Sequence, residues 1–381
     1  MKRGIWLYVV CMLTALLLFM ETACAQHYIY GGSADDILGE VAVGSNGRMV
    51  MTGYTNSADG TLSARTKKGR SGWALCIDAQ GDVIWSFVSR LGNHDIMSSP
   101  VIHEDGSVTL ILEAETDVSQ EMEAIRLDCE GNVLNRKTMQ KTGGGIEYLW
   151  VAPPLWHEGY VLEEMDDKAG SVGFSLYDYD GNRIAQLSPE QWHPKGRAHA
   201  AGERHAIQID AGTGTLYVHE ESGEERKLAS VFEVSESGRL GARYNSLISL
   251  PDGGAAGCGW VLSGDTRKGL ISRWDAEGAL EFEMWLEIGQ LYSMVKTDSG
   301  FAASCCTGEE NDAAGENQSW EVVYFDEMGS IVRREALEPG EAPASSACNL
   351  ALLPDGRIAA VQNFETGRGG IERDIRVTIL E

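Results

Sequence analysis

Short runs of alternating apolar and polar residues recur along the whole chain, and turns that contain glycine separate them. Clear examples are Arg48–Thr52, Ser107–Leu112 and Ile358–Val361. Alternation with a period of two predicts β-strands that bury one face. We find no sustained apolar stripe with helical spacing and caps, so the pattern predicts an all-β chain.

Two glycine turns alternate along the sequence. An Asp or Ser followed three residues later by glycine recurs at Gly81, Gly131, Gly181, Gly238, Gly278 and Gly329, with spacings of 50, 50, 57, 40 and 51 residues. The other turn comes first within each repeat, and its glycine recurs at Gly47, Gly106, Gly159, Gly214, Gly253, Gly300 and Gly356. Glycine after Asp, Asn or Ser favours tight hairpins because it adopts positive φ. Two hairpins per repeat predict four strands, and four-stranded units at this period are typical of a β-propeller.

The repeat count predicts a seven-bladed β-propeller with four antiparallel strands in each blade. The last repeat ends after Ile375–Leu380 with one strand missing, and His27–Tyr30 precedes the first repeat as a spare strand. We expect this N-terminal strand to close the last blade and cover its edge. In the fourth blade Glu203–His205 and Gly212–Gly214 compete as the first turn, and the spacing to Gly238 favours the second. The expected blade bounds are 32–90, 91–142, 143–191, 192–243, 244–287, 288–338, and 339–381 with 27–30.

Residues 1–25 have the features of an export signal. The basic pair Lys2-Arg3 precedes the charge-free stretch Gly4–Met20, and Ala23-Cys24-Ala25 fits a cleavage site that leaves Gln26 first. We therefore expect a secreted or cell-surface protein. An uncleaved membrane anchor and a lipoprotein acylated at Cys24 remain as alternatives. No later segment has the roughly 18 apolar residues of a membrane span.

The charge of the chain narrows the choice of partner. The 381 residues are 43% hydrophobic and 23% charged, as in an ordinary globular protein. They include 57 acidic and 31 basic residues, for a net charge of −26. Such a surface repels phosphate backbones and anionic lipid, which argues against a nucleic-acid partner. We expect a monomer that takes no cofactor and binds a protein or a glycan.

The first repeat resembles a known family. Gly31-Gly32-Ser33-Ala34-Asp35-Asp36 opens it, Gly53–Gly60 follows its second strand, and Trp73–Trp85 contains the next turn. This order is similar to exported bacterial propeller repeats of the form GGS-x-DD, G-x-T-x-S-x-DG and W-x4-D-x-x-G-x3-W. The segment Leu91–Asp95 resembles a degenerate copy of the GGS-x-DD element. The resemblance implies the propeller fold, of the PQQ-like or WD-like kind, and an exported location. It implies no catalytic residue.

Local motifs of catalysis and metal binding are absent. The sequence has no G-x-S-x-G, H-E-x-x-H or phosphate-binding G-x-x-x-x-G-K. The histidines of the fourth repeat match no metal-ligand spacing, so we expect no metal site. Asp178–Asn182 resembles a calcium loop, but it lacks the terminal bidentate Glu and has the position of a hairpin in the repeat.

Three of the cysteines leave alternatives open. Cys258 and Cys305 each lie five residues after their repeat's first-turn glycine, which predicts one packing layer in adjacent blades or a disulfide. Cys305 and Cys306 are adjacent. They could form a strained vicinal disulfide. The simpler interpretation is that they are neighbouring strand residues whose side chains point to opposite faces of the sheet.

The candidate functional residues belong to loops on one face of the predicted disc. Asp35-Asp36 and His94-Asp95 directly precede innermost strands, where we expect them to line the central channel. Trp192-His193 lies in an inter-blade loop and offers an aromatic ring to a sugar or peptide. Loops that are acidic around Glu163–Asp167 and Glu309–Glu316 would attract cationic or polar partners.

Two functions follow from this face. The first is an exported, non-catalytic propeller that binds a protein or glycan through its loops. The alternative is a propeller enzyme that acts on a carbohydrate or small molecule in the central channel. Glycoside hydrolysis there needs two carboxyl groups about 5–10 Å apart.

Overall fold

The structure is a computed structural model, and it describes most of the chain after residue 24. The described residues are 25–62, 69–89, 93–115, 119–142, 148–152, 159–166, 171–187, 196–201, 205–210, 216–220, 225–227, 242–264, 266–307, 319–337, 348–365 and 372–380. Apart from one 3-10 turn, η1 (Gly60–Leu62), their regular elements are strands. The prediction of an all-β chain is confirmed.

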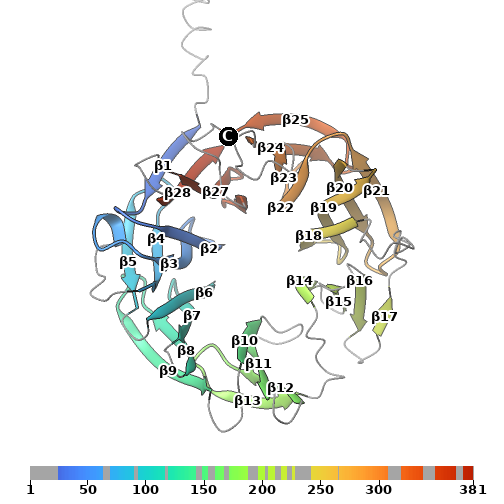
Figure 1. The fold of residues 1–381 in the computed structure, drawn as a ribbon. Coiled ribbons are helices and arrows are strands. Elements are labelled where there is room, and N and C mark those ends of the chain that lie inside the picture. Colours follow the sequence, from blue (N-terminus) through green and yellow to red (C-terminus); the bar gives the residue numbers. More distant parts are fainter. Residues whose placement is uncertain are drawn as a thin grey trace, which may run out of the picture.

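The described strands form seven four-stranded antiparallel sheets, which are arranged as a ring around an open centre (Figure 1). Sheet 1 contains β2 (Asp36–Val43), β3 (Met49–Thr55), β4 (Ser71–Ile77) and β5 (Val83–Val88). Sheet 2 contains β6 (His94–Ile102), β7 (Val108–Glu115), β8 (Gln120–Leu127) and β9 (Val133–Lys141). Sheet 3 contains β10 (Tyr148–Ala152), β11 (Tyr160–Asp166), β12 (Ser171–Tyr177) and β13 (Arg183–Leu187). Sheet 4 contains β14 (Gly196–Ala201), β15 (His205–Asp210), β16 (Leu216–Glu220) and β17 (Glu225–Lys227).

The remaining three sheets complete the ring. Sheet 5 contains β18 (Ala242–Ser249), β19 (Ala255–Ser263), β20 (Thr266–Trp274) and β21 (Leu280–Leu286). Sheet 6 contains β22 (Gln290–Thr297), β23 (Gly300–Thr307), β24 (Ser319–Asp326) and β25 (Ile331–Ala336). Sheet 7 contains β26 (Cys348–Leu352), β27 (Ile358–Glu365), β28 (Arg373–Leu380) and β1 (Gln26–Tyr30). The arrangement is that of a β-propeller.

The N-terminal strand joins the last sheet, as the missing strand predicted. β1 pairs antiparallel with β28, with His27 opposite Thr378 and Tyr30 opposite Ile375. The Tyr30 hydroxyl also donates to the carbonyl of Gly81 in sheet 1, at 2.6 Å. Sheets 7 and 1 are therefore joined both by strand pairing and by a buried hydrogen bond.

The hydrophobic core lies between neighbouring sheets rather than inside any one of them. One cluster of buried residues joins Met51 and Leu75 of sheet 1 to Val361 and Val377 of sheet 7. Similar clusters join sheets 1 and 2, 2 and 3, 5 and 6, and 6 and 7. A single four-stranded sheet cannot bury its own apolar faces. They are buried only when neighbouring sheets pack against one another around the axis.

Aspartate side chains build the turn between the third and fourth strands of sheets 1, 2, 3, 5 and 6. In the turn between β4 and β5, Asp78 Oδ1 accepts from the backbone N–H groups of Gln80 and Asp82, both at 2.9 Å. Gly81 then takes a φ of 83°. Asp128 and Asp178 make the same contacts in sheets 2 and 3. The segment Asp178–Asn182 is therefore a hairpin turn, and the hairpin prediction from the repeat is confirmed.

The predicted first turn of the fourth repeat is wrong. β14 ends at Ala201 and β15 begins at His205, so the first connection spans 202–204, and Gly212–Gly214 falls between β15 and β16. The predicted turn at Gly238 is wrong as well, because β17 ends at Lys227 and Gly238 comes after the fourth strand of this sheet. The strands of this sheet have only three to six residues, so its turns follow one another more closely.

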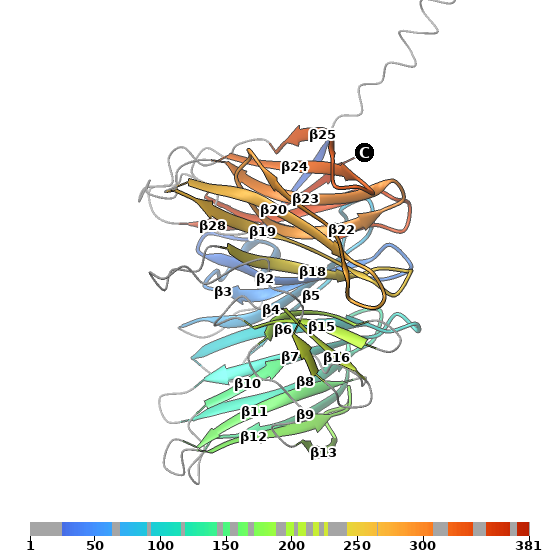
Figure 2. The ribbon, with the colours of Figure 1, turned by 90° about the vertical axis from the view of Figure 1, so that its right-hand side faces the viewer.

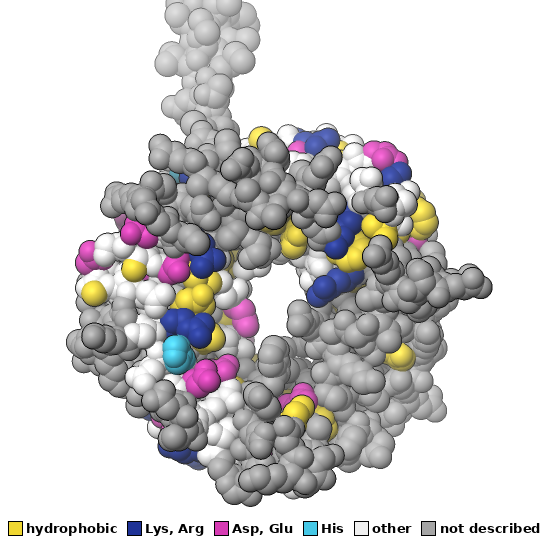
Figure 3. All heavy atoms as spheres, in the orientation of Figure 1, with side chains coloured by type: hydrophobic (Ala, Val, Ile, Leu, Met, Phe, Trp, Pro, Cys, Tyr) yellow, Lys and Arg dark blue, Asp and Glu magenta, His cyan; other side chains and the backbone are white. Residues whose placement is uncertain are grey.

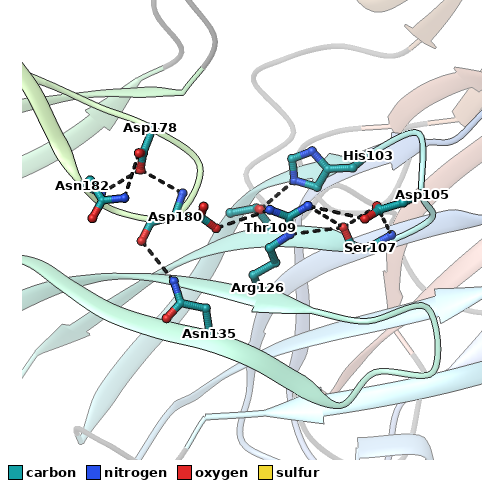
Figure 4. A network of polar contacts seen from close by, with 9 residues as sticks. All are labelled: His103, Asp105, Ser107, Thr109, Arg126, Asn135, Asp178, Asp180 and Asn182. Atoms are coloured by element: carbon teal, nitrogen blue, oxygen red, sulfur yellow. Dashed lines mark hydrogen bonds and ion pairs between the residues drawn. The ribbon is translucent and has the colours of Figure 1, made fainter.

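Arginines join neighbouring sheets on the face that carries the hairpin turns. Arg126 of β8 contacts Asp105 in the first turn of its own sheet and Asp180 in the second turn of sheet 3 (Figure 4). Its Nε and Nη2 also donate to Ser107 Oγ at 3.2 and 3.1 Å. Asn135 Nδ2 donates to the Asp180 carbonyl from β9 at 3.3 Å. The ring is thus fastened by polar contacts at this face as well as by its core.

Candidate functional site

The candidate site is the mouth of the central channel on the face opposite the hairpin turns. Figure 2 shows the hairpin turns on one side of the disc and the longer connections on the other, which we call the loop face. The innermost strands β2, β6, β10, β14, β18, β22 and β26 all begin at this face. Figure 3 views the loop face and shows a hollow centre with basic side chains at several places around it.

Asp36 does not line the channel, which corrects the prediction. Its side chain is fully buried at 0% exposure. Oδ2 accepts from the Gly32 N–H at 2.7 Å and from Ser57 Oγ at 2.8 Å, and Oδ1 accepts from Thr55 Oγ1. Burial raises the pKa of Asp36. The carboxyl group is occupied by structural hydrogen bonds because the loop folds over it.

The glycine-rich motif around Asp36 is a clasp between two loops of sheet 1. Ser33 N–H donates to Asp59 Oδ1 at 2.7 Å, and Ala34 N–H donates to Ser57 Oγ at 3.0 Å. Gly60 has a φ of 68°, and a Cβ there would lie 2.0 Å from the Gly31 carbonyl. These positions therefore hold two backbone segments together, and the residues that resemble the repeat motif have a structural role.

The other predicted site residues are also tied to neighbours or lie outside the described part. Asp95 is fully buried, so it does not line the channel, and it accepts from Ser89 Oγ at 2.5 Å. Asp35 forms an ion pair with Arg373 of β28 at 3.2 Å. His94 is exposed, and its Nδ1 accepts from Arg70 Nε at 3.4 Å. Trp192 and His193 lie outside the described residues.

The channel wall instead presents Glu40, which the sequence analysis missed. Glu40 occupies a bulge in the innermost strand β2, where the pairing register shifts between Leu38 and Val41. Its side chain is exposed, yet protein surrounds it because the channel is enclosed, and this enclosure raises its pKa. Glu40 Oε2 accepts from the Ser99 N–H of β6 at 2.9 Å. Ser99 has a φ of 50°, unusual for a residue other than glycine.

Hydrogen bonds to residues of the innermost strands join several pairs of neighbouring sheets. Tyr160 OH donates to the Ser99 carbonyl at 3.2 Å, which joins sheets 3 and 2. Asn245 Nδ2 donates to the Leu291 carbonyl at 2.7 Å, and Leu350 N–H donates to Ser293 Oγ at 3.0 Å. These contacts join sheets 5, 6 and 7. The channel wall is therefore polar where the strands bulge.

Two equivalent arginine–aromatic groups lie at the channel mouth. In sheet 1 the guanidinium of Arg70 lies 4.9 Å from the centre of the Tyr54 ring. In sheet 5 the guanidinium of Arg267 lies 4.2 Å from that of Trp260. Tyr54 pairs with Gly72 and Trp260 pairs with Gly269, and each arginine lies two residues before that glycine. Each guanidinium also donates a hydrogen bond to the first residue of the next innermost strand. That residue is His94 in sheet 2 and Gln290 in sheet 6.

The group on sheets 5 and 6 carries a second positive charge. Arg243 lies directly opposite Trp260 in the pairing of β18 with β19. Burial lowers the pKa of Arg267, and Arg243 lowers it further by repulsion, against an opposite effect of Tyr292. Gln290 Oε1 accepts from Arg267 Nη1 at 3.1 Å and from Tyr292 OH at 3.3 Å. Arg243, Trp260, Arg267, Gln290 and Tyr292 are called the arginine cluster below.

No local sequence pattern identifies the arginine cluster, because its residues come from four strands of two sheets. The one local signal was a pair of basic residues, Arg267-Lys268, in an acidic chain. The predicted acidic loop of the third repeat is wrong, because Glu163, Glu164 and Asp166 lie in strand β11. Positions 167 and 309–316 lie outside the described residues.

The six cysteines of the described residues are free thiols. Cys258 and Cys305 are both buried in the core between sheets 5 and 6, so the predicted shared packing layer is confirmed. Burial raises their pKa values. Within the described residues no group of three or more His, Cys, Asp or Glu side chains is placed to hold a metal ion. None of the described helices is long and apolar enough to cross a membrane.

Comparisons with known proteins show the fold and no family. No family model matches the chain, and no curated protein matches its sequence. A solved streptogramin B lyase is similar over 94% of this chain and 98% of its own, with 10% identity and a TM-score of 0.51. A catalytically inactive virginiamycin B lyase from Staphylococcus aureus, solved with quinupristin, is similar over 93% of this chain and 99% of its own, with 12% identity and a TM-score of 0.51. At such identities the likeness extends to the β-propeller fold alone.

Proposed function

We propose that this chain is an exported, seven-bladed β-propeller that binds a protein or glycan through its loop face without catalysing a reaction. The observation that carries the proposal is the burial of Asp36 and Asp95. Glycoside chemistry needs two carboxyl groups with access to substrate, and these two are occupied by Thr55, Ser57 and Ser89. The arginine cluster at the same mouth has the chemistry of a binding surface.

Export is supported by the position of the first strand. β1 begins at Gln26, the residue that follows the expected cleavage site, and it pairs with β28 through its whole length. The leader is therefore not needed for closure of the ring. Free, buried cysteines suit either redox environment, since they pack as small apolar side chains.

A direct test uses the chain from Gln26 on an array of purified glycans and proteins, with product analysis by mass spectrometry for each ligand. Binding with no product supports the proposal. Arg70→Glu and Arg243→Glu on the loop face should abolish binding. Arg183→Glu, at an exposed position where β13 leaves its hairpin turn, should leave binding in place. Release of a product, or loss of binding only on the hairpin face, would overturn the proposal.

One observation favours the enzyme as a second candidate. Glu40 is a carboxyl group with a raised pKa in an open channel, and such groups are frequent among general acids. Among the described residues it contacts Ser99. If the screen finds a product, Glu40→Gln should remove turnover while ligand binding persists.

A further inference from the structure

We propose that the arginine cluster is a binding site for the carboxylate of an acidic sugar. Arg243 and Arg267 would hold the carboxylate, and Gln290 and Tyr292 would contact ring hydroxyls. This inference rests on the loop-face binding proposed above and names its ligand class.

The first argument is the charge of the cluster. Arg126, Arg273 and Arg373 each pair with a carboxylate, as is expected in a chain with a net charge of −26. Arg243 forms no ion pair and no hydrogen bond with any residue that the structure describes. It lies beside Arg267, another positive charge. Two adjacent guanidinium groups repel each other until an anion lies between them, and a planar carboxylate matches their donors.

The second argument is the orientation of the neutral groups. Gln290 Oε1 accepts from both Arg267 Nη1 and Tyr292 OH. Its amide oxygen is thereby fixed toward these two donors, and its NH2 group points away from them. Burial raises the pKa of Tyr292, so the hydroxyl keeps its proton near neutral pH. Amide and phenol groups fixed in this way are suited to hydroxyl groups next to a carboxylate.

The third argument is the size of the ligand. The basic groups at this place are few, and the chain around them is strongly acidic. Long polyanions such as nucleic acids would meet repulsion beyond the cluster. A ligand with one carboxylate and several hydroxyls gives Arg243 an anionic partner beside Arg267. Its hydroxyl groups can accept from the Gln290 NH2 group and donate to the Tyr292 hydroxyl oxygen, whose own proton goes to Gln290 Oε1. Figure 3 shows the basic and apolar side chains next to the hollow centre, where a sugar end has access.

The test is calorimetric titration of the chain from Gln26 with tri-galacturonate, with neutral galactotriose and with tri-glutamate as the matched peptide acid. We expect tri-galacturonate to bind, galactotriose to bind at least about tenfold more weakly, and salt to weaken the acidic ligand. Arg243→Gln should weaken tri-galacturonate binding by about tenfold or more, since a charged hydrogen bond is lost. Arg243→Lys should restore part of the affinity.

Two further variants separate this role from a structural one. Gln290→Glu supplies an internal carboxylate to Arg267 and should abolish binding while the melting temperature holds or rises. Arg183→Gln removes the same charge from an exposed position on the outer strand β13 and should leave the affinity within about twofold.

Several outcomes would overturn the inference. They are no binding of tri-galacturonate, equal binding of galactotriose, stronger binding of tri-glutamate, or equal losses for Arg243→Gln and Arg183→Gln. If neutral glycans bind and loop-face variants prevent it, the proposed function stands and only the acidic ligand is rejected.

Discussion

Arg126 of sheet 2 and Arg273 of sheet 5 occupy equivalent positions and make equivalent contacts. Each lies two residues before the aspartate of its second turn. Arg126 reaches Asp105 in its own first turn and Asp180 in the next sheet, and Arg273 reaches Asp252 and Glu327 in the same way. Each arginine therefore joins two neighbouring sheets at the hairpin face.

Replacement of either arginine by methionine should lower the free energy of unfolding. We expect a loss of about 1 kcal/mol for Arg126→Met and for Arg273→Met, because partly exposed ion pairs contribute little individually. Arg126 has two acidic partners, and Arg273 has a third in Glu281 of β21. The losses should add in the double variant, since the sites are far apart. Urea denaturation at low and high salt measures this. Arg183→Met is the control, and an effect as large there would contradict the role of the contacts.

Ser99→Gly should stabilise the protein by up to about 1 kcal/mol. Ser99 has a φ of 50°, where a Cβ costs about 1–2 kcal/mol and glycine has no such cost. Its N–H and carbonyl bonds to Glu40 and Tyr160 use the backbone and persist. The neighbouring Ser98 lies in extended strand, so Ser98→Gly should lower the free energy of unfolding by about 0.5–1 kcal/mol. Chemical denaturation of both variants gives their free energies of unfolding. Changes of the same sign would contradict backbone strain at Ser99.

Glu40→Gln should alter the pH dependence of stability. Burial raises the pKa of Glu40 above its ordinary value of 4.5, so the folded state binds this proton more tightly than the unfolded chain. The ionised carboxylate therefore costs stability above its folded-state pKa, and the cost disappears as the pH falls toward 4.5.

The Gln side chain still accepts from the Ser99 N–H, so the variant removes the charge alone. We expect Glu40→Gln to be more stable than the original chain at pH 7 and equal to it below about pH 4.5. Urea denaturation across this range tests the sign. Asp36 and Glu113 also have raised pKa values, and the difference between variant and original cancels their common contribution. A difference that does not change with pH would exclude this account.

Alkylation of the native protein should distinguish the cysteines. Cys258, Cys305 and Cys348 are fully buried with raised pKa values, and burial raises the pKa of Cys76 to about 11. Cys129 is half-buried on the hairpin face, and its thiol contacts Glu130 Oε1 at 3.1 Å. The contact with Glu130 raises the pKa of Cys129, so its reaction should be slow, because the thiolate is the reactive form. Its thiol is nevertheless the more accessible, and we expect iodoacetamide to modify Cys129 before the four buried thiols.

The four buried thiols should react only after denaturant is added. Peptide mapping by mass spectrometry gives the order of modification. A Cys258–Cys305 or Cys305–Cys306 disulfide in the unmodified sample would contradict the free thiols of the structure.

The repeat architecture follows from local chemistry, which is why the sequence predicted it well. Asp78 and Gly81 build their turn with contacts that span only a few residues, and the same residues recur at matching positions. Four strands per unit and closure by His27–Tyr30 are consequences of that count. The prediction lost accuracy in sheet 4, where Gly212–Gly214 falls in the second connection, because its strands are short and the glycine spacing of the other repeats does not mark its hairpins.

The site depended on contacts that no local pattern encodes. Asp36 and Asp95 precede innermost strands, as the sequence showed, yet the loops fold over them, and Ser57 and Ser89 satisfy their carboxyl groups. Arg243, Arg267 and Gln290 come from three strands of two sheets and meet only when the ring closes. The sequence by itself therefore determined the repeat, the hairpins and the closing strand, because turn chemistry is short-range. The tertiary structure alone decided which charges are buried and which face the channel, because burial depends on the stacking of neighbouring sheets.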